Sequence, residues 1–373
     1  MIIGIDANEA NIGKRVGVNV IAFELLWGLY KLKPKNINFR ILLSNSPLSD
    51  LPKQTNWWQY EVFGPSSFWT FTGLPKRLYF AKPKIDVMFS PSHYGPLISP
   101  VPFVVSIMDL GFLRWPEQFT KKDYFQLKYG TRQSVKKATK VITISEFSKK
   151  DIVETYKTRS EKVEVVFPGY KKPENLKVDT QIVKQKFSLE DDYLLYLGTL
   201  KPSKNISKLI KAFKMFVLKY PKTKLVLAGK KGWLYKEIFA LVKKLNLEEK
   251  IVFTGYVSEK DKLALLKKAK ALILSSLWEG FGIPVLEAFG SNTPVICSKL
   301  ASLPEVAGDA AIYIKNPNSV NSIYLSLIKM VKLSQEQRNR LIEKGKKQLD
   351  RFSWEKAAKK TLLILKKVGE NKK

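Results

Sequence analysis

Several residue types are scarce in this chain of 373 residues, and each scarcity excludes a class of protein. The single cysteine, Cys297, excludes an internal disulfide, and its apolar neighbours indicate a buried filler. The sequence has no run of eighteen apolar residues, so we expect no membrane span. Residues 1–6 lack a basic start and a long apolar stretch, so they predict a first strand and not a signal peptide. We therefore expect a cytoplasmic protein.

Acidic residues are also scarce, because 33 of them stand against 65 basic residues and give a net charge of +32. Such an excess attracts polyanions, so nucleic acid, an anionic membrane face and acidic glycans are all candidate partners. The lysines are spread along most of the amphipathic stretches, and no RNA- or DNA-binding motif occurs among them. We therefore expect no specific nucleic-acid partner.

Short apolar runs alternate with amphipathic stretches along the chain, which is typical of parallel sheets covered by helices. In the first half we expect strands near 2–6, 39–43, 86–89, 103–107, 140–144 and 163–166, and helices near 18–33, 121–138 and 146–156. In the second half we expect strands near 193–197, 224–228, 250–254, 271–275, 294–297 and 311–314, and helices near 204–219, 233–245, 258–269, 284–290, 318–331, 334–349 and 353–367. A polar stretch from Pro168 to Val183 predicts a hinge between two α/β domains, 1–170 and 171–352.

The segment 278–288 contains two carboxylates, Glu279 and Glu287, on either side of a glycine-broken loop. A proline after the loop predicts the start of a short helix, which places Glu279 on the loop and Glu287 on the helix. Gly280 and Gly282 let the backbone approach a ligand, and the helix start would face an anion. Because ionised carboxylates only accept hydrogen bonds, the pair suits a hydroxyl-rich group such as a ribose or a hexose.

This segment resembles the E-x7-E signature of the retaining glycosyltransferases of family 4, and the likeness continues through 293–296 and 303–311. It covers nearly the whole chain and is strongest over 193–311. The resemblance implies the GT-B fold, with two Rossmann-like domains facing each other across a cleft and a last helix that crosses back to the N-terminal domain. It also implies transfer of a hexosyl group, with mannosyl favoured, from a nucleotide diphosphate sugar to a glycan or lipid-linked acceptor. The sequence has no Asp-x-Asp element in a fitting place for a divalent ion, so we expect neither a metal nor another cofactor.

In this family context a basic surface indicates docking on anionic lipid, peripheral on the inner face of the cell membrane. The resemblance assigns Glu279 to the transferred sugar, as a catalytic residue, and Glu287 to the ribose. Lys204 matches the family's lysine for the donor diphosphate, and Lys201 can substitute for an arginine that many relatives carry where this chain has Ser203. The remaining expected donor contacts come from the signature loop and from two further turns: Gly280, Phe281, Gly282, Ile283, Gly229 and Val257.

On the acceptor or sugar side, Gly17 lies in a stretch that resembles the family's glycine loop, although Asn19 replaces a more usual glycine. A segment that usually reads His-Asp-Leu assigns Asp109 as catalytic, but this chain has Met108 where the histidine would face the reacting sugar. The single histidine, His93, also follows a predicted strand and is a further candidate, while a lone histidine is more often structural.

Between Trp57 and Phe80 the chain is rich in aromatic residues. Such residues, with nearby Lys76 and Arg77, favour a membrane interface, so the segment is a candidate for docking on lipid or for receiving an amphipathic acceptor. The equal alternative is that half of these rings pack the core of the N-terminal domain.

Three alternatives to a transferase stay open. A nucleotide-sugar epimerase of the same two-domain shape would need no acceptor. A non-catalytic sugar or nucleotide binder is made credible by Met108. A nucleic-acid-binding protein is suggested by the net charge of +32 alone.

Overall fold

The computed structural model describes residues 1–66, 68–80, 82–171, 179–189 and 193–370. The chain divides into two compact units. The first comprises Met1–Pro116, Thr120–Gly169 and Phe352–Lys373, and the second comprises Glu117–Phe119 and Tyr170–Arg351. Among the described residues, no helix has both the length and the apolarity that crossing a bilayer requires.

The first unit is built on a parallel sheet of seven strands in the order β3-β2-β1-β4-β5-β6-β7. Every residue of β4 and β5 is buried, because helices cover both faces of the sheet and each strand is a short apolar run. The strands are β1 (Ile2–Asp6), β2 (Asn38–Leu43), β3 (Trp58–Val62), β4 (Val87–Ser90), β5 (Phe103–Ser106), β6 (Lys140–Thr143) and β7 (Val163–Val165).

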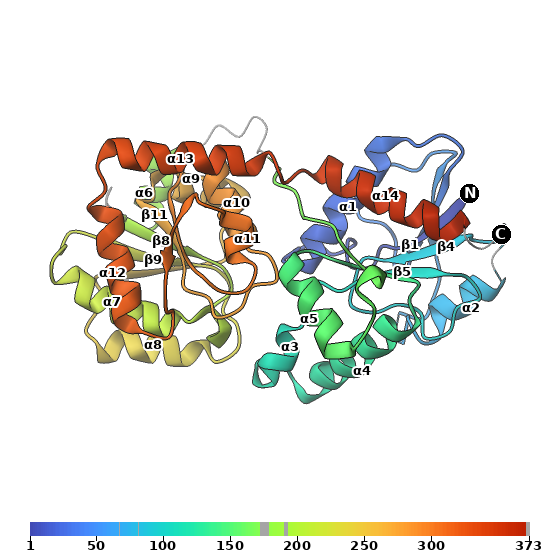
Figure 1. Ribbon diagram of the computed structural model, residues 1–373, viewed down its shortest axis with the longest axis horizontal. Helices are drawn as coiled ribbons and strands as arrows, with labels where there is room; N and C mark the ends of the chain where they lie inside the picture. Colours follow the sequence, from blue (N-terminus) through green and yellow to red (C-terminus); the bar gives the residue numbers. More distant parts are fainter. Residues whose placement is uncertain (67, 81, 172–178, 190–192, 371–373) are drawn as a thin grey trace. The chain divides into compact units, whose positions relative to one another are not determined.

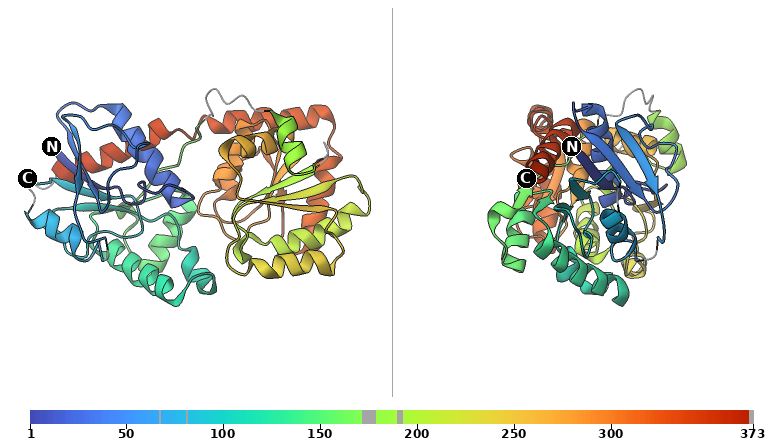
Figure 2. Two further views of the ribbon diagram at one scale, coloured as in Figure 1. Left: turned by 180° about the vertical axis from the view of Figure 1, so that it is seen from behind. Right: turned by 90° about the vertical axis from the view of Figure 1, so that its right-hand side faces the viewer.

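The helices of the first unit lie in two layers, with α1 and α14 on one side of the sheet and α2, α4 and α5 on the other (Figures 1 and 2). They are α1 (Val18–Leu32), α2 (Gly73–Phe80), α3 (Gly111–Arg114), α4 (Lys121–Lys137), α5 (Glu146–Tyr156) and α14 (Trp354–Glu370). Helix α14 packs closely on α1, since a Cβ placed on Gly28 would lie 2.7 Å from Cβ of Ala358. The expectation that the last helix returns to the N-terminal domain is therefore confirmed.

The second unit holds a parallel sheet of six strands in the order β10-β9-β8-β11-β12-β13. The strands are β8 (Tyr193–Leu197), β9 (Lys224–Ala228), β10 (Ile251–Gly255), β11 (Ala271–Leu274), β12 (Val295–Ser298) and β13 (Ala311–Ile314). The helices are α6 (Thr180–Lys186), the 3-10 turn η3 (Pro202–Lys204), α7 (Ile206–Val217), α8 (Tyr235–Lys244), α9 (Glu259–Lys268), α10 (Ile283–Gly290), α11 (Leu303–Ala307), α12 (Val320–Val331) and α13 (Gln335–Leu349).

The order of strands reverses between β1 and β4 in the first sheet and between β8 and β11 in the second. In open parallel sheets ligands bind beyond the carboxyl ends of the strands at such a switch point. The loops after these four strands are therefore the places where each unit is expected to carry functional side chains.

The predicted architecture of two Rossmann-like units is confirmed, but several elements differ from the expectation. Strand β3 and helices α2, α3, α6 and α11 were not predicted. The proposed hinge, Pro168 to Val183, is wrong at its end, because Asp179 caps α6 and the helix begins at Thr180. Part of that stretch, 172–178, lies outside the described residues.

Candidate functional site

The loops after β8 and β11 are joined by side-chain and main-chain hydrogen bonds at the switch point of the second unit. The Asn205 side chain donates to the carbonyl of Ser275 at 3.1 Å and to that of Pro317 at 2.7 Å. The amide of Leu277 donates to the carbonyl of Ser203 at 2.9 Å. Asn205 has a φ of 58°, in the left-handed region that asparagine tolerates better than most residues. This turn positions the preceding residue, Lys204, beside the loop after β11.

Lys204 and Glu279 form an ion pair, with 2.6 Å between Nζ and Oε2. Their side chains retain 15% and 14% of their exposure, so the pair is mostly but not fully withdrawn from water. The Ser276 hydroxyl donates to the other carboxylate oxygen of Glu279 at 2.7 Å. Tyr196 is buried in the same unit, and its pKa is raised well above 10.0, mainly by burial and secondly by the charge of Glu279. The carboxylate of Glu279 is thus held in one orientation by a cation and a hydroxyl.

The loop from Glu279 to Gly282 is shaped by glycine and by a buried serine. Gly282 has a φ of 104°, and a Cβ on it would lie 2.8 Å from Cδ2 of Leu303. The Ser302 hydroxyl lies within 2.9 Å of the carbonyls of both Glu279 and Phe281. Helix α10 begins directly after this loop, as predicted, although it begins at Ile283, so its proline is the second residue. The main chain here presents the start of a helix next to the ion pair.

Glu287 lies on α10 and pairs with a lysine that the sequence analysis did not identify. The Nζ of Lys262 lies 2.5 Å from Oε1 of Glu287 and 2.7 Å from Oε2 of Glu259. Burial opposes the charge of Lys262, but the two carboxylates outweigh it and raise its pKa above 10.5. Lys262 is on α9, 25 residues before Glu287. No local motif signals this contact, because only the packing of α9 beside α10 creates it.

The turns after β8, β9 and β10 pack their glycines against one another. The amide of Gly229 donates to Gly255 at 2.9 Å, and the amide of Gly198 donates to Ala228 at 2.9 Å. A Cβ on Gly229 would lie only 1.9 Å from the carbonyl oxygen of Gly198. Val257, in the turn after β10, is buried. These turns follow the carboxyl ends of neighbouring strands of one sheet.

The first unit carries the other predicted site residues at the carboxyl ends of its own strands. Gly17 has a φ of 53° and precedes the first residue of α1. The side chain of Asn19, where a glycine is more usual, donates to Glu9 at 2.6 Å. The loop after β1 is therefore tied to the start of α1 by a side-chain hydrogen bond.

His93 follows β4, and Asp109 follows the neighbouring strand β5. Burial lowers the pKa of His93 below 6.5, while the charge of Asp109 acts in the opposite direction. Among the described residues, Nδ1 of His93 is buried without a hydrogen-bond partner. Asp109 accepts a hydrogen bond from the amide of Gly111 at 2.7 Å, and the His93 ring lies edge-on to Phe112. His93 is therefore neutral at pH 7 and near one carboxylate.

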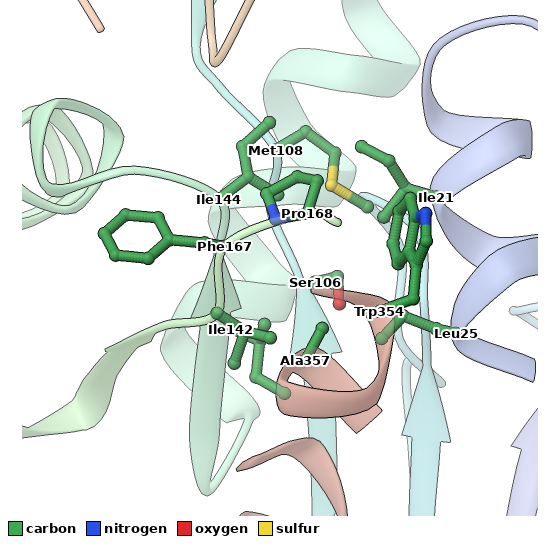
Figure 3. A pocket seen from close by; sticks show the side chains of 11 residues that line it. Ile21, Leu25, Ser106, Met108, Ile142, Ile144, Phe167, Pro168, Trp354 and Ala357 are labelled. Atoms are coloured by element: carbon green, nitrogen blue, oxygen red, sulfur yellow. The ribbon is translucent and has the colours of Figure 1, made fainter. Parts of the chain in front are cut away.

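Met108 is turned into the interior of the first unit. It lines a small apolar cavity of about 10 Å³, which Figure 3 shows with its sulfur beside Trp354 and Ile21. The hydroxyl of Ser106, at the same cavity, has no partner among the described residues. A methionine fits this irregular space because its side chain is unbranched and flexible. The assignment of His93, Gly17 and Asp109 to the sugar or acceptor stays a prediction, and the burial of Met108 favours a packing role for its side chain over the predicted contact with the sugar.

Comparison with known proteins identifies the family. Residues 177–348 match the model of the family described as "Glycosyl transferases group 1". This part of the chain belongs to the group 1 glycosyl transferases. The chain is 29% identical over 266 residues to O-antigen chain mannosyltransferase B of Escherichia coli, and the aligned part covers 69% of the chain and 68% of the relative. It is 32% identical over 218 residues to O-antigen chain mannosyltransferase RfbU of Salmonella typhimurium, which covers 58% of each.

Solved structures agree on the fold. WaaG, a glycosyltransferase involved in lipopolysaccharide biosynthesis, superposes with a TM-score of 0.71 at 17% identity, over 98% of this chain and 99% of that one. Anabaena HepE in complex with UDP-glucose gives 0.74 at 17% identity with the same coverage. The expectations of a group 1 glycosyl transferase and of the GT-B fold are confirmed, while membership of family 4 stays a prediction.

Proposed function

We propose that this glycosyltransferase moves a hexosyl group from a nucleotide diphosphate sugar to an acceptor hydroxyl with retention of anomeric configuration. The observation that carries the proposal is the ion pair of Lys204 with Glu279 where β8 and β11 end. A carboxylate accepts hydrogen bonds from polyol hydroxyls, and an ammonium serves as a point charge for phosphate. The pair therefore supplies the two kinds of contact that an activated sugar needs.

In the donor complex, Lys204 turns from Glu279 to the diphosphate. Glu279 then accepts hydrogen bonds from the transferred sugar, and Glu287, oriented by Lys262, accepts them from the ribose. Lys201 and the main chain at Gly282 and the first residue of α10 add positive potential at the diphosphate. The turns that contain Gly229 and Val257 lie beside the base of the nucleotide. Gly280 and Phe281 belong to the loop that lies beside the transferred sugar.

In the reaction the acceptor oxygen bonds to the anomeric carbon while the bond from that carbon to the diphosphate breaks. The proton of the acceptor hydroxyl leaves with the diphosphate. The developing negative charge is stabilised by Lys204 and the start of α10, so we propose that neither a metal nor another cofactor takes part. On the acceptor side we assign Gly17, His93 and Asp109 to contacts, with Met108 as a packing residue behind them.

We further propose a mannosyl donor and a glycan or lipid-linked acceptor. This rests on the relatives in Escherichia coli and Salmonella typhimurium that are named O-antigen chain mannosyltransferases. A mannose and a glucose differ only in the direction of one hydroxyl, so contacts such as those of Glu279 decide between them.

A thermal-shift screen with UDP, GDP, ADP and their sugars tests donor binding first. The donor that stabilises the protein is then incubated with acceptor, and the products are analysed by NMR. A new glycosidic bond supports the proposal. Donor binding without turnover favours a non-catalytic binder, and a changed sugar without acceptor favours an epimerase. No stabilisation by any nucleotide would overturn the proposal.

A further inference from the structure

The turn after β9 is fixed against the turn after β8 by main-chain hydrogen bonds. The amide of Leu200 donates to the carbonyl of Lys230 at 2.9 Å, and the amide of Gly232 donates to the carbonyl of Leu200 at 3.0 Å. Leu200 and Lys231 form a parallel bridge between the two turns. A Cβ on Gly232 would lie 2.7 Å from the carbonyl oxygen of Leu200, so a larger residue would push the turns apart. The main chain of 230–232 therefore has a defined position beside the turn that carries the proposed diphosphate contacts.

The two lysines of this turn contact different aromatic rings. The ammonium of Lys231 lies over the rings of Tyr235 and Phe239 of α8, at 5.3 and 5.5 Å from their centroids. The ammonium of Lys230 lies over the ring of Tyr256, in the turn after β10, at 5.1 Å from its centroid. Tyr256 is 55% exposed, so an aromatic ring with a cation beside it is accessible to solvent. The ring lies at the carboxyl ends of β9 and β10, where the proposed function places the base of the donor.

Main-chain groups of these turns are already paired with one another. The amide of Gly229 donates to the carbonyl of Gly255 at 2.9 Å, and that carbonyl also accepts a hydrogen bond from the hydroxyl of Thr254 at 3.0 Å. The carbonyl of Lys230 accepts the hydrogen bond from Leu200. A base that binds here would have to compete with these hydrogen bonds, which costs free energy. We therefore expect side chains to distinguish one base from another, and the ammonium of Lys230 is the charged group beside the exposed ring.

We propose that Tyr256 and Lys230 recognise the base of the donor nucleotide and that this base is guanine. The inference rests on the proposed function and extends it by naming the nucleotide. The base stacks on the exposed ring of Tyr256, and stacking on an aromatic side chain strengthens binding about 5- to 150-fold. The base takes the place of the ammonium over the ring, and the flexible side chain of Lys230 moves to the edge of the base.

The chemistry of the lysine side chain selects among the bases. An ammonium only donates hydrogen bonds. One edge of guanine presents two adjacent acceptors, O6 and N7, whereas adenine has an amino donor beside its N7. Uracil offers an acceptor at O4, but its single ring makes fewer contacts with Tyr256 than a purine does. A lysine at the O6 and N7 edge therefore discriminates guanine from adenine by about 5- to 150-fold.

Calorimetric titration of the full chain with GDP, IDP, ADP and UDP tests the proposal. IDP keeps O6 and N7 of guanine and lacks only its amino group. Wild type should bind GDP and IDP within about threefold of each other, and it should bind ADP and UDP at least about tenfold more weakly. In Lys230→Met, which removes the ammonium, the preference for GDP over ADP should fall below about twofold. Tyr256→Leu should weaken the binding of all four compounds about tenfold, because the stacking ring is lost.

Lys231→Met is the matched control, because it removes the adjacent ammonium, which lies over the rings of α8. It should keep the wild-type affinities, and so should Tyr256→Phe, which retains the ring. All variants should keep the wild-type melting temperature.

Several results would overturn this inference while leaving the proposed function intact. They are a wild-type preference for ADP or UDP, IDP binding as weak as that of ADP, and a preference for GDP over ADP that persists in Lys230→Met or is lost equally in Lys231→Met. Absence of binding by every nucleoside diphosphate would instead overturn the proposed function together with this inference.

Discussion

Replacing Lys262 by methionine removes the ammonium that lies 2.5 Å from Glu287 and leaves that carboxylate without its cation. Breaking a fully buried pair costs about 3–5 kcal/mol and breaking an exposed one less than about 1 kcal/mol. Lys262 and Glu287 are 19% and 18% exposed, so we expect about 2 kcal/mol of destabilisation. For a unit of this size that lowers the melting temperature by about 4–8 °C.

Lys262→Met should also weaken donor binding, because Glu287 loses the ion pair that orients its carboxylate. A hydrogen bond to a charged group contributes about 1.5–3 kcal/mol, so the affinity for the preferred nucleoside diphosphate should fall roughly 10- to 100-fold. Calorimetric titration measures this directly. Lys262→Arg should retain most of the affinity, and Lys260→Met, an exposed lysine on the same helix, is the matched control. Affinity in Lys262→Met equal to that in Lys260→Met would refute the reasoning.

The pH dependence of this pair has a definite sign. The pKa of Lys262 in the folded state lies above its ordinary 10.5. The stabilisation is therefore fully present below pH 10.5 and is lost as the pH rises through the folded value. The stability difference between wild type and Lys262→Met should stay constant near neutrality and shrink only in strong alkali, as measured by urea unfolding.

Three other outcomes are expected. Gly229→Ala should destabilise the protein by about 2–4 kcal/mol in urea unfolding, because its Cβ would lie 1.9 Å from the carbonyl oxygen of Gly198; a change below about 0.5 kcal/mol would contradict the close packing. His93 is neutral because burial lowers its pKa, so wild type should lose stability relative to His93→Gln as pH falls below 6.5; parallel curves would exclude this. A chelator should leave the transfer rate unchanged, since Lys204 provides the positive charge, and loss restored by a divalent ion would contradict that role.

The elements that could be predicted from the sequence are those whose signal is local. Most strands of the two sheets are short apolar runs, and glycine, proline and a carboxylate at fixed spacing indicate α10. Strand β3 escaped prediction because Trp58 and Val62 enclose polar residues at the sheet edge, which gives no continuous apolar run. Helix α6 escaped because it lies in a lysine-rich stretch with one buried residue, Val183.

The residues of the candidate site can also be separated into those with a local sequence signal and those without one. Glu279, Lys204 and Glu287 belong to sequence motifs that can be recognised locally. Lys262, the partner of Glu287, does not, because it becomes a neighbour only when α9 packs beside α10, whereas Ser276 lies three residues before Glu279 in the same loop. In the aromatic segment from Trp57 to Phe80, Trp58 and Trp69 are buried while Phe68 and Phe80 are exposed, and composition alone cannot distinguish the two groups.

The central claim is that the two signature carboxylates bind the hydroxyls of the donor, and one titration tests it most directly. The affinity of wild type and of Glu287→Ala is measured for the preferred nucleoside diphosphate and for its 2′,3′-dideoxy analogue. We predict that wild type binds the dideoxy analogue more than about tenfold more weakly and that Glu287→Ala binds both compounds equally. Equal binding by wild type, or an unchanged preference in Glu287→Ala, would contradict the account.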